Sequence, residues 1–577
     1  MPDYRCRSAP AIRGMSRARR LRFGAVIVAL CLGALSACVA IPDSGGANSG
    51  LSLVDNGGTA DIAFNPLGPE KDSSQSKILH GFVAAFTSAT GGYAVAKQFL
   101  SPAFASKWDP RQGVDVRSGQ AKMATVGPTE MTYSFASSAS VNTDGAYVEA
   151  DQSFTLQIGF VKVNGQWRID AAPNGIVLPE LTFQRIFQQH PLYFLDSSNQ
   201  YLIPDLRWFP SGTAATRIVG ALLAGPPDWL KGAAFSRFPD GTRLSSSGSV
   251  ITPDEGVARV DLTKEALGAS PRERELMKVQ LIESLRSVST ISRVSVAVEG
   301  TPLQITDLGS NGPQSDGKVD TQALVLRKKD FGFLANNVVA TVSQLSKAVV
   351  ALNPSAATLS ADQNSAVVLG PGGVSIVKRG VASPQPLDTR AGLIAPSLDS
   401  YGFIWSVPSS SPKDLHVFDP TGAVHTISLG LPGGAQIAAL EVSREGARVA
   451  ILLSTSTGPR LAVAAIVRDE KLVPTGIGPL IVDYAITDGS AQDVTWVDES
   501  SVATLVSTAD LSKVELVVIG GRRSSLGTIS PAAVQLVGGN DGVNGLRALG
   551  TDRAIWTYRG SSWQSSQVMV DFLANQR

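Results

Sequence analysis

Cys38 is the residue whose position offers the most definite chemistry. It stands where the uncharged, fifteen-residue run Phe23–Ala37 meets a Gly- and Ser-rich stretch, and residues 1–22 carry seven arginines and one acidic residue. A basic region followed by a short apolar region is typical of a secretory signal peptide. Fifteen residues are too few for a bilayer span, which needs roughly 20. We therefore predict a signal peptide that ends beside a thiol open to modification.

The four residues Leu35-Ser36-Ala37-Cys38 resemble the bacterial lipobox, in which small residues precede a cysteine. The resemblance implies that residues 1–37 are removed and that Cys38 becomes an N-palmitoyl, S-diacylglycerol cysteine. It implies a chain that is lipid-anchored at the cell membrane, on the extracytoplasmic face. The alternative is an ordinary signal peptide with a chance cysteine near its cleavage site. The start of translation stays open between Met1 and Met15.

The four histidines, His80, His190, His416 and His425, are the other candidates for metal or acid–base chemistry. His416 and His425 lie nine residues apart around a hairpin-like pattern, so facing strands could bring them together. A zinc site needs at least three protein ligands, and no third one is in view. We find no G-x-S-x-G, no H-E-x-x-H and no P-loop. The sequence therefore predicts no catalytic residue, no metal site and no cofactor.

Asp399 belongs to a motif that invites a catalytic interpretation. The segment Ser397–Trp405, "SLDSYGFIW", nearly matches the S-x-D-x-G-x-x-W motif of sialidase propellers, with Tyr401 at the glycine position. We expect instead a turn in which the Asp399 carboxylate accepts hydrogen bonds from nearby backbone N–H groups. A pair of carboxylates suited to glycoside hydrolysis stays open, because the sequence does not show which acids converge.

The composition of the exported chain narrows the possible partners. Without residues 1–37 the chain has 540 residues, with 43 Lys and Arg against 48 Asp and Glu, a net charge of −5. That balance gives no reason to expect nucleic acid or an anionic membrane surface as a partner. Cys38 is the only cysteine left, so disulfides and cysteine–metal sites are excluded. A chain of this length is expected to fold as several domains.

Residues 38–76 are rich in Gly, Ser, Asn and Pro, and we predict a lipidated N-terminus and a tether with a reach of about 35 Å. Residues 77–182 then change from helical to strand patterning. Lys77–Ala89 carries apolar residues at helical spacing, and Asn164-Gly165 separates two strand-like runs, a strong hairpin signal. Helices followed by a curved antiparallel sheet resemble NTF2-like or cystatin-like α+β modules.

Residues 188–306 carry a sharper resemblance. The segments "ALLAGPPD", "FPDGTRL" and "VARVDLT" occur in that order, and Ser270-Pro271-Arg272-Glu273 forms a capping box that opens a helix. The arrangement resembles the GerMN domain, a small α+β sandwich of extracytoplasmic proteins. No catalytic residue comes with this resemblance.

Residues 320–577 are predicted to form an all-β propeller that follows a linker-like stretch at 307–320. A sequence pattern recurs along this region: an apolar residue, a polar turn and then a strand of alternating apolar residues. It begins at Leu359, Leu398, Val442, Val497 and Leu549. Repeats of this size built from strands and turns are typical of propeller blades. Five repeats are visible and a sixth could lie within 320–345, so the number of blades stays open.

A lipobox, a GerMN-like domain and a C-terminal propeller in this order resemble the LpqB lipoproteins of actinobacteria. The resemblance implies a non-enzymatic partner for the extracytoplasmic domain of a sensor histidine kinase. In the LpqB family the kinase is MtrB. It belongs to the MtrA–MtrB two-component system, which governs cell-envelope and division functions. No interface residue can be mapped from it. Two alternatives stay open, a cell-envelope glycan hydrolase on the propeller and a small-ligand sensor that uses the N-terminal module.

Overall fold

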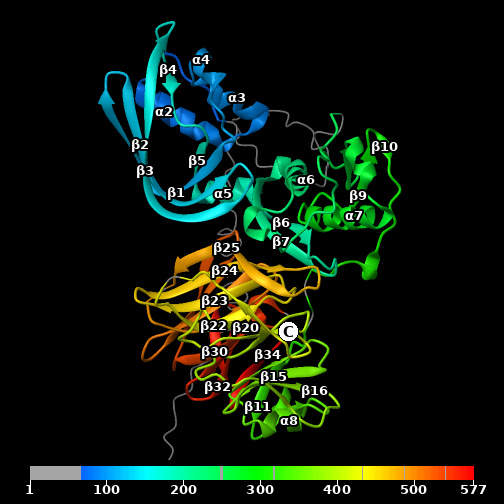
Figure 1. Ribbon diagram of the computed structural model, residues 1–577. Coiled ribbons are helices and arrows are strands. Elements are labelled where there is room, and N and C mark those ends of the chain that lie inside the picture. The colour runs from blue at the N-terminus through cyan, green and yellow to red at the C-terminus, as the bar shows by residue number, and fades with distance from the viewer. Residues whose placement is uncertain are drawn as a thin grey trace, which may run out of the picture. The chain divides into compact units, whose positions relative to one another are not determined.

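The computed structural model describes residues 66–577, except 247–250, 316, 318, 432, 487 and 540. Three folded parts follow one another along the chain, an N-terminal α+β module, a GerMN-like domain and an all-β propeller (Figure 1). The predicted fold class is confirmed. The predicted signal peptide, Cys38 and most of the tether lie outside the described residues. Within the described part of the chain, no helix is both long and apolar enough to cross a membrane.

The N-terminal module packs short helices against one curved sheet. The sheet order is β4-β3-β2-β1-β5, with β5 parallel to β1 and the other neighbours antiparallel. Its elements are α2 (Gln75–Ala84), η1 (Ala85–Thr87), α3 (Thr90–Gln98), α4 (Pro102–Ala105), β1 (Gly113–Gly127), β2 (Glu130–Asn142), β3 (Tyr147–Val163), β4 (Gln166–Ala171), β5 (Ile176–Pro179) and α5 (Glu180–Ile186).

Local signals set the boundaries of these elements. The Ser74 side chain accepts a hydrogen bond from the Lys77 N–H, so α2 begins at Gln75, two residues before the predicted start. Asn164 and Gly165 both have positive φ, 51° and 78°, and join β3 to β4 in the predicted two-residue hairpin. On α2, Phe82 packs its ring against Trp108 at a centroid distance of 5.1 Å. The helix thus buries its apolar face in the core of the module.

In its described residues, the GerMN-like domain has two small sheets and two α-helices. β6 pairs with β7, and β10-β9-β8 form the second sheet, in which β8 and β9 run parallel because α7 connects them. Ser270 and Glu273 make the predicted capping box at the start of α7. The elements are β6 (Phe187–Leu195), β7 (Leu202–Pro210), η2 (Ser211–Thr213), α6 (Ala214–Ala224), η3 (Asp228–Leu230), β8 (Val257–Leu262), η4 (Lys264–Gly268), α7 (Pro271–Leu285), β9 (Arg293–Val298), β10 (Thr301–Pro302) and η5 (Gly309–Asn311).

The propeller has six four-stranded blades in the described part of the chain, and one short helix, α8 (Ser346–Ala351). The blade whose existence the sequence did not settle comes first in chain order. Residues 323–341 form three of its strands, and the last strand of the chain forms the fourth. From the innermost strand outward the blades are β34 (Phe572–Gln576), β11 (Ala323–Arg327), β12 (Asp330–Ala335), β13 (Val338–Thr341); β14 (Ala356–Leu359), β15 (Ser365–Gly370), β16 (Gly373–Lys378), β17 (Gln385–Asp388); β18 (Ser397–Leu398), β19 (Ile404–Ser406), β20 (Leu415–Phe418), β21 (Val424–Ile427); β22 (Gln436–Val442), β23 (Arg448–Thr455), β24 (Gly458–Arg468), β25 (Pro474–Ala485); β26 (Ser490–Trp496), β27 (Ser501–Ser507), β28 (Ser512–Val518), β29 (Arg523–Ile529); and β30 (Ala533–Val537), β31 (Arg547–Gly550), β32 (Ala554–Arg559), β33 (Ser562–Met569).

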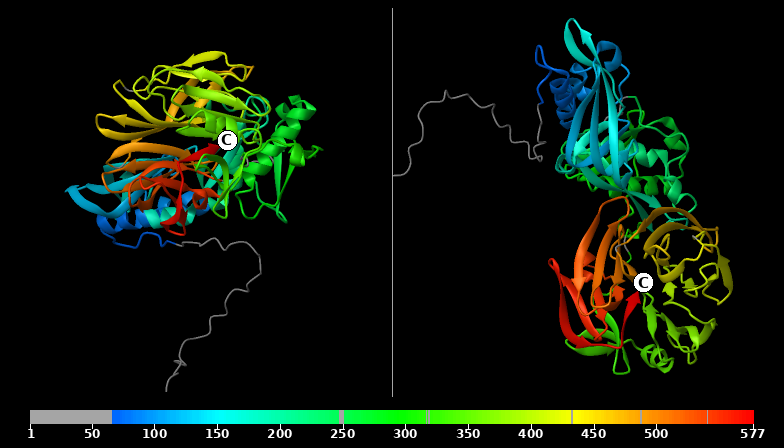
Figure 2. Two further views of the ribbon diagram at one scale, coloured as in Figure 1. Left: turned by 90° about the horizontal axis from the view of Figure 1, so that it is seen from below. Right: turned by 90° about the vertical axis from the view of Figure 1, so that its left-hand side faces the viewer.

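The last strand closes the ring of blades. β34 pairs antiparallel with β11 and parallel with β14, so it joins the first blade to the second. The C-terminal end of the chain therefore lies inside the ring of sheets, as the right-hand view of Figure 2 shows. The pairing of β34 with β14 is the one strand pairing between neighbouring blades among the described residues.

The fifth visible repeat, at Leu549, occupies a different place in its blade from the other four. Four of the repeats lie at the turn between the first two strands of a blade, at Leu359, Leu398, Val442 and Val497. The repeat at Leu549 lies instead at the turn between β31 and β32, the second and third strands of its blade. The pattern marks any tight hairpin, and the segment 538–546 lengthens the first connection of this blade.

A hydrophobic cluster is shared by the GerMN-like domain and the propeller. Trp229 and Leu230 of the former belong to the same buried cluster as Leu461, Val463 and Val482 of β24 and β25. Hydrogen bonds cross the same boundary: Tyr401 Oη donates to Asp196 Oδ2 over 2.8 Å, and Trp208 Nε1 donates to the Gly520 carbonyl over 3.0 Å. These two parts therefore pack as a unit.

Candidate functional site

The six innermost strands of the propeller surround a cavity of about 230 Å³. Each blade contributes to its wall, so residues from positions 355 to 577 converge there. Ser397, Leu440, Val494, Val537 and Leu573 each come from a different blade. The lining mixes small apolar side chains with a few polar ones. The polar side chains decide what the cavity can bind.

Glu441 is one of the two carboxylates in this wall, and its side chain is tied into the protein. Its Oε1 accepts hydrogen bonds from Thr495 Oγ1 over 3.1 Å and from the Trp496 N–H over 3.3 Å. It also forms an ion pair with Arg577. Glu441 is only 4% exposed. These contacts hold β22 to β26 and to the end of the chain, which is a structural role.

Asp493 is the second carboxylate of the cavity. Its Oδ1 accepts a hydrogen bond from the Val494 N–H over 2.9 Å, and its Oδ2 accepts one from the Leu536 N–H of the next blade over 2.8 Å. Burial raises the pKa of Asp493 to about 7, although both hydrogen bonds favour the charged form. Near neutral pH this carboxyl group is therefore divided between its protonated and its charged forms.

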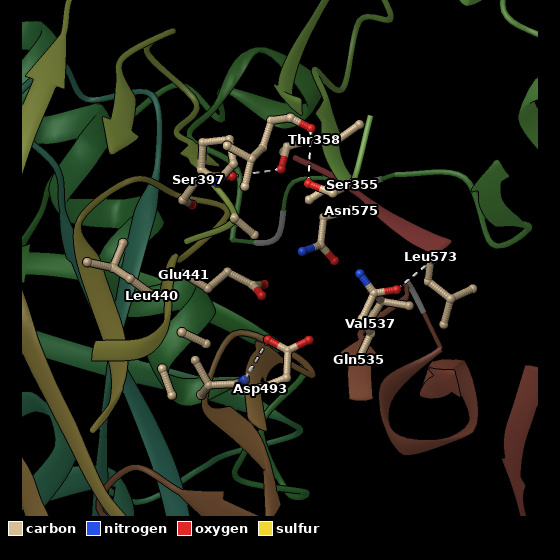
Figure 3. Close-up of a pocket in the computed structure, with 18 of the residues that line it drawn as sticks. Ser355, Thr358, Ser397, Leu440, Glu441, Asp493, Gln535, Val537, Leu573 and Asn575 are labelled. Atoms are coloured by element: carbon tan, nitrogen blue, oxygen red, sulfur yellow. Dashed lines mark hydrogen bonds between the residues drawn. The ribbon is translucent and has the colours of Figure 1, made fainter. Parts of the chain in front are cut away.

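Three amide side chains, Gln492, Gln535 and Asn575, also line the cavity. Gln535 Oε1 accepts a hydrogen bond from the Leu573 N–H over 3.0 Å. Asn575 Oδ1 is buried and accepts no hydrogen bond from any residue that the structure describes. Figure 3 shows the Glu441 and Asp493 carboxylates pointing into the cavity, with the Asn575 amide facing them. The cavity thus holds a buried acceptor that a small donor could satisfy.

The carboxylate pair does not have the surroundings of a glycosidase pair. A general acid or base needs oxygens that can reach the substrate. At Glu441, Oε1 is engaged by Arg577 and by two donors from β26, whereas each Asp493 oxygen keeps a lone pair besides the one used by a backbone N–H.

His416 and His425 do not come together as a metal site. In the hairpin of β20 and β21, His416 lies opposite Thr426 and His425 lies opposite Val417. Successive residues point to opposite faces of a strand, so the two imidazoles face opposite sides. Among the described residues there is no group of three or more His, Cys, Asp or Glu side chains placed to hold a metal ion.

The other two histidines have different surroundings. His80 is exposed on α2. His190 is 1% exposed, and its Nδ1 lies 2.8 Å from Ser287 Oγ. Burial lowers the pKa of His190 to about 4, so its imidazole stays neutral at physiological pH.

Asp399 is the turn residue that the sequence predicts. Its Oδ1 accepts hydrogen bonds from the Tyr401 N–H over 3.0 Å and the Phe403 N–H over 2.9 Å. Its Oδ2 accepts from Trp405 Nε1 over 3.1 Å and from Arg468 Nη2 over 2.6 Å. The carboxylate therefore fastens the turn and pairs with a buried guanidinium.

No sequence motif marks Glu441, Asp493 or Asn575. A signal is present for Glu441, because it is an acidic residue inside the largely apolar strand β22, and a buried polar residue is the informative exception in a core. Their convergence is not visible in the sequence, since it depends on the closing of six blades.

Comparison with protein families covers the three parts in turn. The model described as lipoprotein LpqB, N-terminal domain, matches residues 68–184. The Germane model, described as sporulation and spore germination, matches residues 191–304, and the lipoprotein LpqB beta-propeller domain matches residues 333–571. The chain belongs to the lipoprotein LpqB family. The innermost strand β34 follows the end of the LpqB propeller match.

Curated LpqB lipoproteins resemble the chain over most of its length. The lipoprotein LpqB of Cutibacterium acnes is 24% identical over 523 residues, which cover 83% of this chain and 85% of that protein. The LpqB of Rhodococcus opacus is 24% identical and covers 90% of each chain. Among solved structures, the tandem GerMN domains of the Bacillus subtilis sporulation protein GerM are 20% identical, cover 22% of this chain and 44% of that chain, and have a TM-score of 0.18.

The LpqB N-terminal domain also contains a pocket, between its first helix and its sheet. Leu79, Phe82, Tyr133 and Ile158 line it together with Asp115. Burial raises the pKa of Asp115. The pocket holds about 40 Å³, room for only a few water molecules. This pocket therefore offers little space for the ligand that the small-ligand sensor alternative requires.

Proposed function

We propose that the chain is a lipoprotein anchored through Cys38 on the extracytoplasmic face of the cell membrane. There it acts as a non-enzymatic partner of a sensor histidine kinase of the MtrB type. The single observation that supports this proposal best is the state of the propeller carboxylates, Glu441 and Asp493. Each accepts a hydrogen bond from the next blade and so helps to hold the blades together.

The domain organisation supports a binding role in a second way. The GerMN-like domain and the propeller share buried residues, so they present their outer surfaces as one unit. A lipid anchor would confine that unit and a membrane-embedded kinase to the same surface. Such confinement raises the effective concentration of a weak contact without any new interaction.

Direct binding tests this proposal. The full chain is purified from membranes in detergent, and its binding to the immobilised extracytoplasmic domain of the kinase is followed by biolayer interferometry. We expect a dissociation constant in the micromolar range, which co-anchoring makes sufficient. The absence of binding, together with release of sugar fragments from cell-wall glycan by the purified chain, would establish the hydrolase alternative instead.

A further inference from the structure

The central cavity of the propeller is lined by all six blades and contains a buried acceptor that has no described partner. Buried polar atoms in folded proteins have a partner in the great majority of cases, so each exception calls for an explanation. Asn575 Oδ1 is such an exception among the described residues. It faces the cavity that six blades enclose, together with Asp493 and Glu441 (Figure 3). We propose that this cavity binds a small polar molecule that carries an ammonium group.

The charge of the lining favours a cation over an anion. The charged side chains of the cavity are Glu441 of β22, Asp493 of β26 and Arg577 after β34. Glu441 forms an ion pair with Arg577, so Asp493 adds negative charge. An anionic ligand would meet two carboxylates in a space of low dielectric. An ammonium group instead forms charge-assisted hydrogen bonds with a carboxylate.

The hydrogen-bonding capacity of the lining matches the same group. An ammonium group has three N–H donors and no acceptor. Asn575 Oδ1 is a buried acceptor that accepts no described hydrogen bond. Each Asp493 oxygen has a second lone pair besides the one used by a backbone N–H. Hydroxyl groups on the same molecule would meet the Gln535 amide and Ser397, which also line the cavity. The volume of about 230 Å³ limits the ligand to a small organic molecule.

Binding of a cation should be linked to the proton of Asp493. Burial raises the pKa of this carboxyl group to about 7, and a bound ammonium group would lower it. Below pH 7 the ligand must displace a proton, so its affinity falls as the pH decreases. Above pH 7 the carboxylate is already charged, and the affinity levels off. A neutral ligand of the same shape would not show this dependence.

The test compares two probes of nearly identical shape, serinol (2-amino-1,3-propanediol) and glycerol, which differ by an ammonium in place of a hydroxyl group. Both are titrated calorimetrically into the full chain, solubilised in detergent, at pH 6 and pH 8. We expect serinol to bind about tenfold more tightly than glycerol at pH 8, because its ammonium group forms a charge-assisted hydrogen bond that the glycerol hydroxyl group cannot form. Its affinity should fall about tenfold at pH 6, with release of a proton visible in buffers of different ionisation enthalpy.

Two variants and one control locate the site. Asp493→Asn should remove the preference for serinol, whereas Asp330→Asn, an exposed acid of the outer strand β12, should leave it unchanged. If Asp493→Asn does not fold, Asn575→Ala decides, since Asn575 Oδ1 has no described partner to lose. It should weaken serinol binding about threefold or more. Equal binding of the two probes, no binding of serinol, or serinol binding that these variants leave unchanged would overturn the proposal.

Discussion

At the residue scale, Asp399 shows how a single buried carboxylate holds a blade together. The side chain of Asp399 is fully buried and that of its partner Arg468 is 5% exposed. Asp399→Ala would leave the guanidinium buried without its partner and would release two backbone N–H groups. We expect a loss of about 3–5 kcal/mol in the free energy of unfolding, measured by chemical denaturation.

Asp419→Ala is the matched control for this prediction. Asp419 also accepts backbone hydrogen bonds in a turn, from Thr421 and Ala423, but it lies nearer the surface of the same blade. Its loss should cost about 1 kcal/mol or less. Equal destabilisation by the two substitutions would show that the buried ion pair of Asp399 contributes nothing of its own.

Cys38 carries the second prediction at this scale. Each buried CH₂ group contributes about 0.8 kcal/mol, so one acyl chain binds a membrane marginally and two or more bind it stably. Cys38→Ala should abolish incorporation of a clickable fatty acid in cells and release the chain from the membrane fraction. Cys31→Ala, within the apolar run, is the control and should keep the label. Equal labelling of both variants would contradict the anchor.

At the scale of elements, the strand β34 should decide the stability of the ring. Ala574 lies in the middle of β34, opposite Leu324 of β11, with β14 on the other side. Proline there removes a backbone donor in a strand with neighbours on both sides. We expect Ala574→Pro to cost about 3 kcal/mol or more in chemical denaturation.

Val339→Pro tests whether position in the blade sets this cost. Val339 lies in β13, the outer edge strand of the same blade, where alternate N–H groups fall outside the ladder. The expected loss is clearly smaller than for Ala574→Pro. A larger loss at Val339 would mean that the ring does not depend on closure by β34.

The elements differ in how far the sequence predicts them, and the reason is the distance over which each signal acts. The capping box at Ser270 and the hairpin at Asn164-Gly165 are local, so their residues alone determine them. Closure by β34 pairs residues about 250 positions apart, and no local pattern encodes it. The cavity with Glu441 and Asp493 escapes prediction for the same reason, because the ring must close before these side chains meet.

At the scale of the whole molecule, the shared cluster predicts that the GerMN-like domain and the propeller stay together. Trp229 is 8% exposed and belongs to the same cluster as Leu461 and Val463 of the propeller. A protease cut within 307–320, the segment predicted as a linker, should therefore give two fragments that elute together in gel filtration. Their separation under native conditions would show that the shared cluster does not hold the two parts together.

Regulation of a sensor kinase by this chain at the membrane is best tested on the activity of the kinase itself. The lipidated chain and the full-length sensor kinase are reconstituted into the same vesicles, and autophosphorylation with ATP is timed. We expect the anchored chain to change the autophosphorylation rate at least twofold. Soluble Cys38→Ala protein at the same concentration should have less effect, because it is not confined to the membrane. An unchanged rate with the anchored chain, at concentrations that saturate the vesicle surface, would contradict the account.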